Sequence, residues 1–376
     1  MESKKVSEKL LLKSAFWYTS SNFLTKAIAF ITIPVFTRIL SKAQYGDFTV
    51  FASWQVLLTI ICGIEAYGTI NKARFDYAKK EDLDSYIFSS ITLGMLFTAL
   101  IFTAYVVLPK TFYNIFLLDS KYILVMFAYL FTYPVFSMFQ AKHSIEYKYK
   151  LSSLISFSVG VFSSLLSIVL TLEMKNDQLL GRIFGQYILY IVVGVLFFIY
   201  FMKCSHRITF SSWKYALSLG IPLVFSALGG QIFIISNNLL VKHMCSAEEV
   251  SYVAITVSCS NIILLLLQAI NSAWAPWLYD MLKMGKEKSI KRAFQIYLWI
   301  VIMITCGVIL IGPEIITVLG GDSYKEAMYI LPASVLCGVF SALTSQFVNL
   351  EIYYGIQKYT TFFTLIVAIF NIVVGA

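Results

Sequence analysis

Two charged side chains inside long apolar runs, Lys26 and Glu65, are the residues of this 376-residue chain best suited to chemistry. Lys26 lies 13 residues after Lys13, or roughly 20 Å along a helix, and Glu65 lies nine residues before Arg74, or about 14 Å. A charge at that depth in a membrane is costly and marks a functional site by default. Lys26, with Asn22 one helical turn away on the same face, is therefore predicted to attract an anionic part of a substrate.

The same two charges lie on successive antiparallel helices, so Lys26 and Glu65 are also positioned to pair. One interpretation is a structural salt bridge that neutralises both side chains inside a helical bundle. The other is a functional pair that opens when an anion or a proton arrives, with Glu65 as the coupling or gating group. Both interpretations stay open at the level of the sequence.

A second set of polar side chains lies on two later apolar runs and is predicted to form a polar wall for substrate. Gln231 and Asn238 are seven residues apart, so both lie on one helix face. Asn261 and Gln268 have the same spacing, and Asn271 follows one turn later. The alternative for each of them is a hydrogen bond between neighbouring membrane helices, which membrane proteins use routinely.

Three further charged residues lie near the predicted ends of membrane spans. Arg38 and Asp47 flank the turn after the first run, where a local salt bridge or a gate between two bundles is expected. Arg182 precedes the sixth run, where it either extends to the membrane surface or contacts substrate. The six cysteines and three histidines show no metal-ligand spacing, so neither a metal nor a cofactor is expected.

The elements that position these residues are apolar runs long enough to cross a membrane. Hydrophobic residues make up 59% of the chain and charged residues 13%, against roughly 25% charged in soluble proteins. About 20 apolar residues span a bilayer core, which predicts an all-α, multi-pass membrane protein. The predicted spans are 14–40, 48–70, 86–108, 122–140, 151–172, 183–202, 214–241, 250–275, 294–311, 327–350 and 359–376. No loop between them is long enough for a soluble catalytic domain, which argues against most enzymes.

The formal net charge of +9 is explained by membrane topology rather than by nucleic acid, which is not expected as a partner. Most of the 29 Lys and Arg residues lie in the N-terminus and in the alternate loops 71–84, 141–150, 203–213 and 280–293. The positive-inside rule places these segments in the cytoplasm. Their basicity also favours contact with anionic membrane lipid.

Two copies of a six-helix unit are predicted from matches at a nearly constant offset. The matched pairs are Ser41 with Ser246, Pro109 with Pro313 and Asp119 with Asp322, which are 203 to 205 residues apart. The two serines each open a span, the two prolines are expected to end helices, and the two aspartates precede spans. Six spans per copy is an even number, so the repeat is parallel and a substrate path is expected between the two bundles.

The repeat predicts an N-terminal six-helix bundle over 1–203 and a C-terminal bundle over 204–376, arranged around a central cavity. In this register the run 359–376 is the counterpart of the fifth span, and the second bundle lacks its last helix. We interpret the chain as a C-terminally truncated form of a protein with at least twelve spans.

Three motifs resemble a known family. Residues 33–41 (IPVFTRILS), followed by Tyr45 and Gly46, resemble the end of the first helix in Wzx-type polysaccharide flippases. Residues 181–186 (GRIFGQ) resemble the start of their sixth helix, and residues 271–279 (NSAWAPWLY) the end of their eighth. These flippases belong to the multidrug/oligosaccharidyl-lipid/polysaccharide exporter superfamily, and the resemblance extends over the whole chain.

The resemblance implies transport of an undecaprenyl-diphosphate-linked oligosaccharide to the outer leaflet of the bacterial cytoplasmic membrane, for O-antigen or capsule synthesis. The anion at Lys26 would then be the diphosphate, and the polar wall would bind sugars. Polysaccharide polymerase and glycosyltransferases are the implied partners. The alternatives are a drug or metabolite exporter of the same superfamily, with Glu65 as its coupling carboxylate, and a membrane-embedded polymerase or glycosyltransferase. A purely structural scaffold is disfavoured by the buried Lys26 and Glu65.

Overall fold

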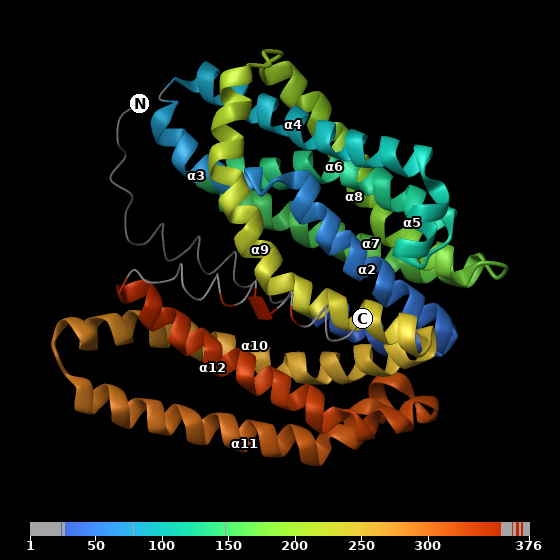
Figure 1. Ribbon diagram of the computed structural model, residues 1–376, viewed down its shortest axis with the longest axis vertical. Helices are drawn as coiled ribbons and strands as arrows, with labels where there is room; N and C mark the ends of the chain where they lie inside the picture. Colours follow the sequence, from blue (N-terminus) through green and yellow to red (C-terminus); the bar gives the residue numbers. More distant parts are fainter. Residues whose placement is uncertain are drawn as a thin grey trace. The chain divides into compact units, whose positions relative to one another are not determined.

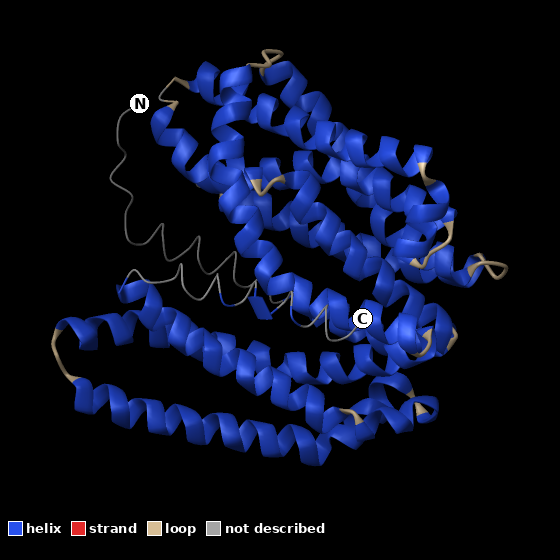
Figure 2. Cartoon of the chain, viewed as in Figure 1, coloured by secondary structure: helices blue, strands red, loops and turns tan. Residues whose placement is uncertain are grey.

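The chain folds almost entirely into helices, as its composition predicts. The computed structural model describes residues 24, 27–77, 79–146, 148–354, 363, 366, 367 and 370. Within those ranges all regular structure is helical and no strand is present (Figure 2). A helix over Ala27–Ile39 is followed by α2 (Lys42–Gly63), α3 (Ala66–Asp76), α4 (Lys80–Val107), α5 (Pro109–Phe116), α6 (Ser120–Ile145), α7 (Tyr149–Glu173), α8 (Gln178–Cys204), α9 (Phe210–Met244), α10 (Ala247–Lys283), α11 (Glu287–Gly320), the 3₁₀ helix η1 (Asp322–Tyr329) and α12 (Leu331–Tyr354).

Seven of the predicted spans coincide with helices that are long and apolar enough to cross a membrane, counted over the described residues. They are Lys42–Asp76, Lys80–Val107, Ser120–Ile145, Lys150–Glu173, Gln178–Cys204, Glu287–Gly320 and Leu331–Glu351. The runs 214–241 and 250–275 lie within α9 and α10, which are 35 and 37 residues long. The protein is therefore a multi-pass helical membrane protein, because only helices satisfy every backbone polar group within one span. The first half of the run 14–40 and nearly all of 359–376 lie outside the described residues.

One predicted helix end is wrong. Pro313 lies inside α11, which continues to Gly320. A proline removes only one backbone donor, and a helix in lipid keeps its remaining hydrogen bonds because no water is available to replace them. Pro109 does mark a boundary, since α4 ends at Val107 and Pro109 opens the short helix α5.

The chain divides into two compact units. Unit 1 comprises residues 1–35 and 50–235, and unit 2 comprises residues 36–49 and 236–376. Both α2 and α9 therefore begin in one unit and end in the other. The predicted repeat boundary at 203–213 comes from matching sequence positions in the two six-helix copies. The division into two units comes from contacts within the folded chain, so the repeat boundary stays a prediction.

In unit 1, α4, α6 and α8 lie side by side, and α7 packs closely against α8 (Figure 1). The close approach of α7 and α8 depends on Gly181 and Gly185, which are spaced four residues apart. A Cβ at Gly181 would lie 2.5 Å from the Leu170 carbonyl oxygen, and one at Gly185 would lie 2.4 Å from the Ser167 Cα. Small residues at this spacing let membrane helices approach at backbone distance. The 181–186 motif therefore has a packing function.

In unit 2, α10 packs against both α11 and α12 (Figure 1). The two helix starts that the repeat aligns, at Ser41 and Ser246, are capped in similar ways. The backbone N–H of Gln44 donates to Ser41 Oγ at 3.2 Å, and the backbone N–H of Glu249 donates to Ser246 Oγ at 3.2 Å. Each cap satisfies a backbone donor that the first helical turn leaves unpaired.

Candidate functional site

Glu65 lies at a break in a membrane span that the sequence does not predict. The run 48–70 was expected to be one helix, but α2 ends at Gly63 and α3 begins at Ala66. Ile64 and Glu65 have φ values of 51° and 49°, which β-branched and charged residues rarely adopt. Backbone strain of this kind persists only where the surrounding structure requires it, and it is concentrated at functional sites. Interrupted membrane helices also expose backbone groups that can bind ions or substrate.

Two tyrosines lie beside the Glu65 carboxylate. Tyr67 and Tyr133, the latter on α6, are both close enough to interact with the Glu65 charge. The expected partner Lys26, together with Asn22, lies outside the described residues. The pairing of Lys26 with Glu65 therefore stays a prediction, and the described neighbours of Glu65 are aromatic hydroxyls.

The five amides of the predicted polar wall lie on α9 and α10, and their common wall stays a prediction. Gln231 belongs to unit 1 and Asn238 to unit 2, although both lie on α9. Asn261 on α10 is exposed, and of Gln268 only its place in that helix is described. Asn271 accepts hydrogen bonds within unit 2.

Asn271 illustrates the structural alternative for such residues. Its Oδ1 accepts from Gln346 Nε2 at 3.2 Å and from Asn349 Nδ2 at 2.7 Å, which joins α10 to α12. Asn349 and Gln346 are themselves only 7% and 3% exposed. An interhelical amide cluster of this kind satisfies polar groups that would otherwise be buried without partners.

Arg182 is buried inside unit 1. Its residue is 8% exposed, between the two glycines that bring α7 and α8 together. The Arg182 carbonyl accepts a hydrogen bond from Ser167 Oγ at 2.7 Å. The contact between α7 and α8 therefore surrounds Arg182, and whether it extends to the membrane surface or contacts substrate stays a prediction.

Arg38 and Asp47 belong to a stretch of unit 2 that we call the docking segment, residues 36–49. Asp47 does not pair locally with Arg38. Its Oδ1 lies 2.6 Å from Lys242 Nζ at the end of α9. Arg38 Nη2 donates to the Val318 carbonyl of α11 at 3.1 Å, and Thr37 Oγ1 donates to the Leu319 carbonyl at 2.5 Å.

Further contacts hold the docking segment to α10 and η1. Lys42 Nζ donates to Tyr252 Oη at 2.7 Å and lies 4.9 Å from the centre of the Tyr252 ring. Tyr252 Oη in turn donates to Glu326 Oε2 at 3.3 Å. Gly46 is so close to α10 that a Cβ there would lie 1.7 Å from the Ala247 carbonyl oxygen. The segment is thus joined to α9, α10, α11 and η1 within unit 2.

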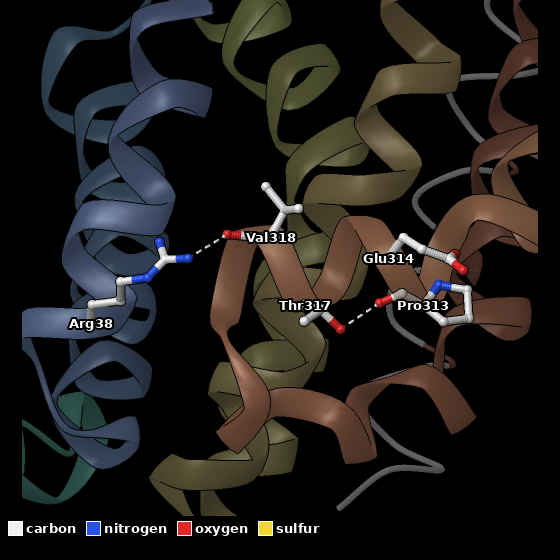
Figure 3. Close-up of a pocket in the computed structure, with 5 residues that line it drawn as sticks. All are labelled: Arg38, Pro313, Glu314, Thr317 and Val318. Atoms are coloured by element: carbon white, nitrogen blue, oxygen red, sulfur yellow. Dashed lines mark hydrogen bonds between the residues drawn. The ribbon is translucent and has the colours of Figure 1, made fainter.

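An open cavity of about 490 Å³ adjoins this segment, lined by Arg38 and by Pro313, Glu314, Thr317 and Val318 of α11 (Figure 3). Arg38 and Glu314 contribute opposite charges to its walls. Its openness and its mixed charge make it a solvated recess beside the docking segment rather than an enclosed substrate site.

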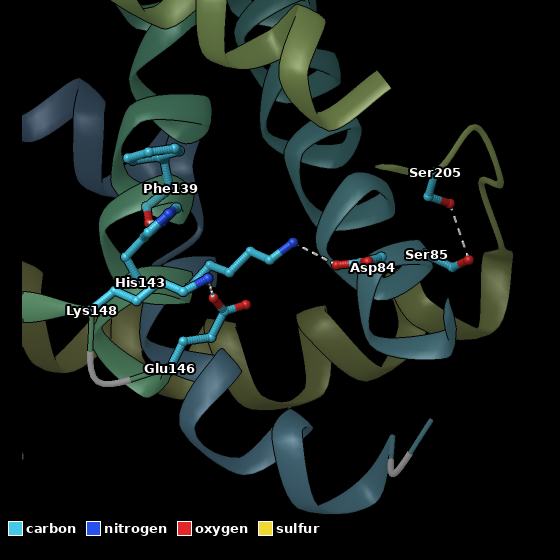
Figure 4. Close-up of polar contacts among 8 residues, drawn as sticks. Asp84, Ser85, Phe139, His143, Glu146, Lys148 and Ser205 are labelled. Atoms are coloured by element: carbon cyan, nitrogen blue, oxygen red, sulfur yellow. Dashed lines mark hydrogen bonds and ion pairs between the residues drawn. The ribbon is translucent and has the colours of Figure 1, made fainter. Parts of the chain in front are cut away.

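The most buried ion pair among the described residues joins Asp84 and Lys142, and sequence reasoning missed it. Asp84 Oδ1 lies 2.6 Å from Lys142 Nζ, and the two side chains are 9% and 5% exposed. Figure 4 shows the polar contacts around Asp84 at the start of α4. Lys142 Nζ also lies 5.5 Å and 5.7 Å from the centres of the Phe201 and Tyr200 rings of α8. The two charges are 58 positions apart in the chain, so no spacing rule would have connected them.

The chain is similar in structure to a known transporter and in sequence to two bacterial proteins. Over 94% of this chain and 84% of the other, it is similar to an inward-facing multidrug resistance MATE family transporter of the MOP superfamily, with a TM-score of 0.64 and 14% identity. It is also 21% identical over 369 residues to a protein of the Lsg locus of Haemophilus influenzae, covering 93% of this chain and 86% of that one. A membrane protein of the same organism is 22% identical over 300 residues, which is 74% of this chain and 67% of that one.

The fold is similar to that of a MATE family transporter. Residues 11–282 match the family described as "Polysaccharide biosynthesis protein". The chain belongs to that family, and the resemblance drawn from its three motifs is confirmed.

Proposed function

We propose that the protein moves an undecaprenyl-diphosphate-linked oligosaccharide from the cytoplasmic to the outer leaflet of the bacterial cytoplasmic membrane, and that it is a transporter rather than an enzyme. The observation that carries the proposal is the family match over residues 11–282 in a chain with a transporter fold. Attachment to a lipid keeps a polysaccharide precursor in the bilayer, where a membrane protein can bind it. Polysaccharide polymerase and glycosyltransferases are the proposed partners, acting after and before transport.

The proposed orientation places the N-terminus and the basic loops in the cytoplasm, as the distribution of Lys and Arg indicates. In that orientation the docking segment lies at the outer side. Its network of hydrogen bonds and the Asp47–Lys242 pair are proposed to act as a gate that is released during transport. Support comes from α2, which begins in unit 2 at this segment and ends in unit 1 at the strained Glu65 break.

Roles for individual residues follow from the chemistry of the substrate. Lys26 and Asn22 are proposed to bind the diphosphate, and the amides Gln231, Asn238, Asn261 and Gln268 to bind sugar hydroxyls. Glu65 is proposed as the coupling carboxylate, supported by its strained backbone and its tyrosine neighbours. The burial of Arg182 and the interhelical bonds of Asn271 support structural roles for both.

Deletion of the gene tests the function. The expected result is lipid-linked oligosaccharide that stays in the cytoplasmic leaflet and loss of surface polysaccharide. The intact gene should reverse both effects.

Lys26→Ala should abolish transport at normal membrane abundance, whereas Lys288→Ala, a change at an exposed lysine, should not. Near-normal transport by the double variant Lys26→Ala with Glu65→Ala would instead make Lys26 a structural partner of Glu65. Unchanged surface glycan in a strain without a second exporter would contradict the proposal.

A drug or metabolite exporter is the second candidate, and the similarity to a multidrug resistance transporter favours it. The two candidates differ in what accumulates in the deletion strain. Exporter function predicts higher intracellular levels of cationic drugs with normal surface polysaccharide. Flippase function predicts the opposite pattern.

A further inference from the structure

A second polar cavity lies in unit 1 at the ends of three membrane helices. It has a volume of about 340 Å³ and is lined by residues at the start of α4, at the ends of α6 and α8, and directly after α6. Its charged lining residues are Lys80, Glu81, Asp84, Lys142, Glu146 and Lys148. Three ammonium groups and three carboxylates therefore surround a space at the lower end of the size range for small-molecule sites.

The charges lie in two layers. The floor is the Asp84–Lys142 pair, whose side chains are 9% and 5% exposed and which is therefore fixed in place. The rim carries Glu146 and Lys148, whose side chains are 31% and 58% exposed and whose charged atoms lie 2.6 Å apart. Lys80 and Glu81 are exposed residues at the start of α4. The exposed part of the lining thus offers two positive and two negative groups.

The surroundings of the cavity are apolar on the lipid side. Along α8, Val192, Val195, Leu196 and Ile199 are between 45% and 58% exposed and share one helix face. Tyr200, which is 40% exposed, continues this face and also lines the cavity. In a membrane protein such a stripe contacts acyl chains, and the ends of the spans lie at the depth of the lipid headgroups.

The balance of charge selects the ligand class. The three ammonium groups and three carboxylates cancel, so the lining has no net charge that would favour a simple anion or a simple cation. A zwitterion can pair with both kinds of group, with its anion beside Lys80 or Lys148 and its cation beside Glu81 or Glu146. A primary ammonium donates hydrogen bonds to carboxylates, whereas a trimethylated one has no N–H and is bound by aromatic cages. Among the described residues that line the cavity, Tyr200 is the single aromatic ring.

We propose that this cavity binds the phosphoethanolamine headgroup of a membrane phospholipid, with its acyl chains along the exposed face of α8. The proposal is independent of the transported substrate, because it concerns a cavity within unit 1 and a lipid that is not moved. The bound lipid would connect α4, α6 and α8 where the Asp84–Lys142 pair already joins two of them.

Native mass spectrometry of the purified full chain tests the proposal. The protein is placed in nanodiscs containing equal amounts of phosphatidylethanolamine, phosphatidylcholine and phosphatidylglycerol, then released, and the retained lipid is measured. The wild-type protein should retain phosphatidylethanolamine at least about tenfold more than either other lipid, the ratio expected for one additional hydrogen bond to a charged group. Equal retention of phosphatidylethanolamine and phosphatidylcholine, or a preference for phosphatidylglycerol, would overturn the proposal.

Two pairs of conservative changes at the rim separate the two halves of the headgroup. Glu81→Gln with Glu146→Gln should remove most of the preference over phosphatidylcholine, because the ammonium loses its charged acceptors at the rim and keeps only neutral ones. Lys80→Gln with Lys148→Gln should lower retention of both zwitterionic lipids. The matched control is Glu173→Gln with Lys175→Gln, an exposed pair at the end of α7, which should leave retention unchanged.

These rim changes are at exposed positions, and elution volume and thermal stability would verify folding. Retention in both rim variants equal to wild type would overturn the site. Soluble glycerophosphoethanolamine distinguishes a lipid from a free zwitterion. It should displace bound lipid only at large excess, and displacement at equimolar concentration would show that the acyl chains contribute nothing and would overturn the lipid assignment.

Discussion

Two lysine–aspartate pairs with the same 2.6 Å separation have very different surroundings. Asp84–Lys142 in unit 1 is 9% and 5% exposed, whereas Asp47–Lys242 in unit 2 is 30% and 13% exposed. The first lies against two aromatic rings and forms the floor of a cavity. The second joins the docking segment to the end of α9. Because desolvation sets the cost of losing one partner, the difference in burial predicts that the two pairs contribute differently to stability even though their distances are equal.

Removal of one partner from the buried pair should have the largest effect. Asp84→Leu leaves the Lys142 ammonium buried without its partner and should lower stability by about 3–5 kcal/mol. The double change Asp84→Leu with Lys142→Met replaces both charges by apolar groups and should recover most of that loss. Unfolding in detergent measures both. A double variant as unstable as the single one would show that the pair itself, and not the unpaired charge, stabilises unit 1.

The packing of the docking segment can be tested by a substitution that leaves its charged residues unchanged. Gly46→Ala would place a Cβ 1.7 Å from the Ala247 carbonyl oxygen, so α2 and α10 would have to separate. We expect a loss of about 1–3 kcal/mol, the usual cost of overpacking. The matched control is Gly307→Ala in α11, where a Cβ would meet nothing within 4 Å and helix propensity favours alanine by about 1 kcal/mol. Equal thermal stability of the two variants would mean that the close approach at Gly46 is not needed.

The partly exposed pair should give a smaller loss of stability and a larger change in conformation. Lys242→Met leaves Asp47, which retains access to water, and should cost about 1–2 kcal/mol. If the docking segment is a gate, a single cysteine at Ala43 should become more reactive toward an impermeant thiol reagent in this variant. Lys325→Gln, at an exposed pair with Asp322, serves as the control. Unchanged labelling at Ala43 would argue against release of the segment.

A third pair extends the comparison to pH. Burial by itself raises the pKa of the Asp177 carboxyl, but hydrogen bonds from Lys121 and the Leu180 amide outweigh it and hold the pKa below its ordinary 3.8. Because the folded-state pKa is the lower one, Asp177 contributes stability that is complete above about pH 5 and is lost as the pH falls through the folded pKa. Asp177 also accepts the capping hydrogen bond at the start of α8.

Asp177→Asn should therefore lower stability at pH 7 by about 1 kcal/mol. It should also flatten the loss of stability that the wild-type protein shows between about pH 5 and pH 3. Thermal unfolding of both proteins across that range measures the difference. Parallel pH profiles would assign the acid sensitivity to other carboxylates.

Hydrophobic patterning by itself determined the class of the protein, because a chain that crosses lipid must place about 20 apolar residues in each helix. The same patterning located the spans now seen as α4, α6, α7, α8 and α11, and short motifs indicated the family. The capped helix starts at Ser41 and Ser246 were also readable, because capping is local to one helical turn.

Tertiary structure alone decided which charges meet. Asp84 and Lys142 are 58 positions apart, and Asp47 and Lys242 are 195 apart, and side-chain periodicity carries no information over such separations. It also decided the break at Ile64 and Glu65, since neither residue favours positive φ and only packing can impose it. The role of Gly181 and Gly185 became readable once Leu170 and Ser167 were placed against them. Local sequence sets local geometry and hydrophobicity, whereas desolvation, charge pairing and close packing depend on partners that only the folded chain brings together.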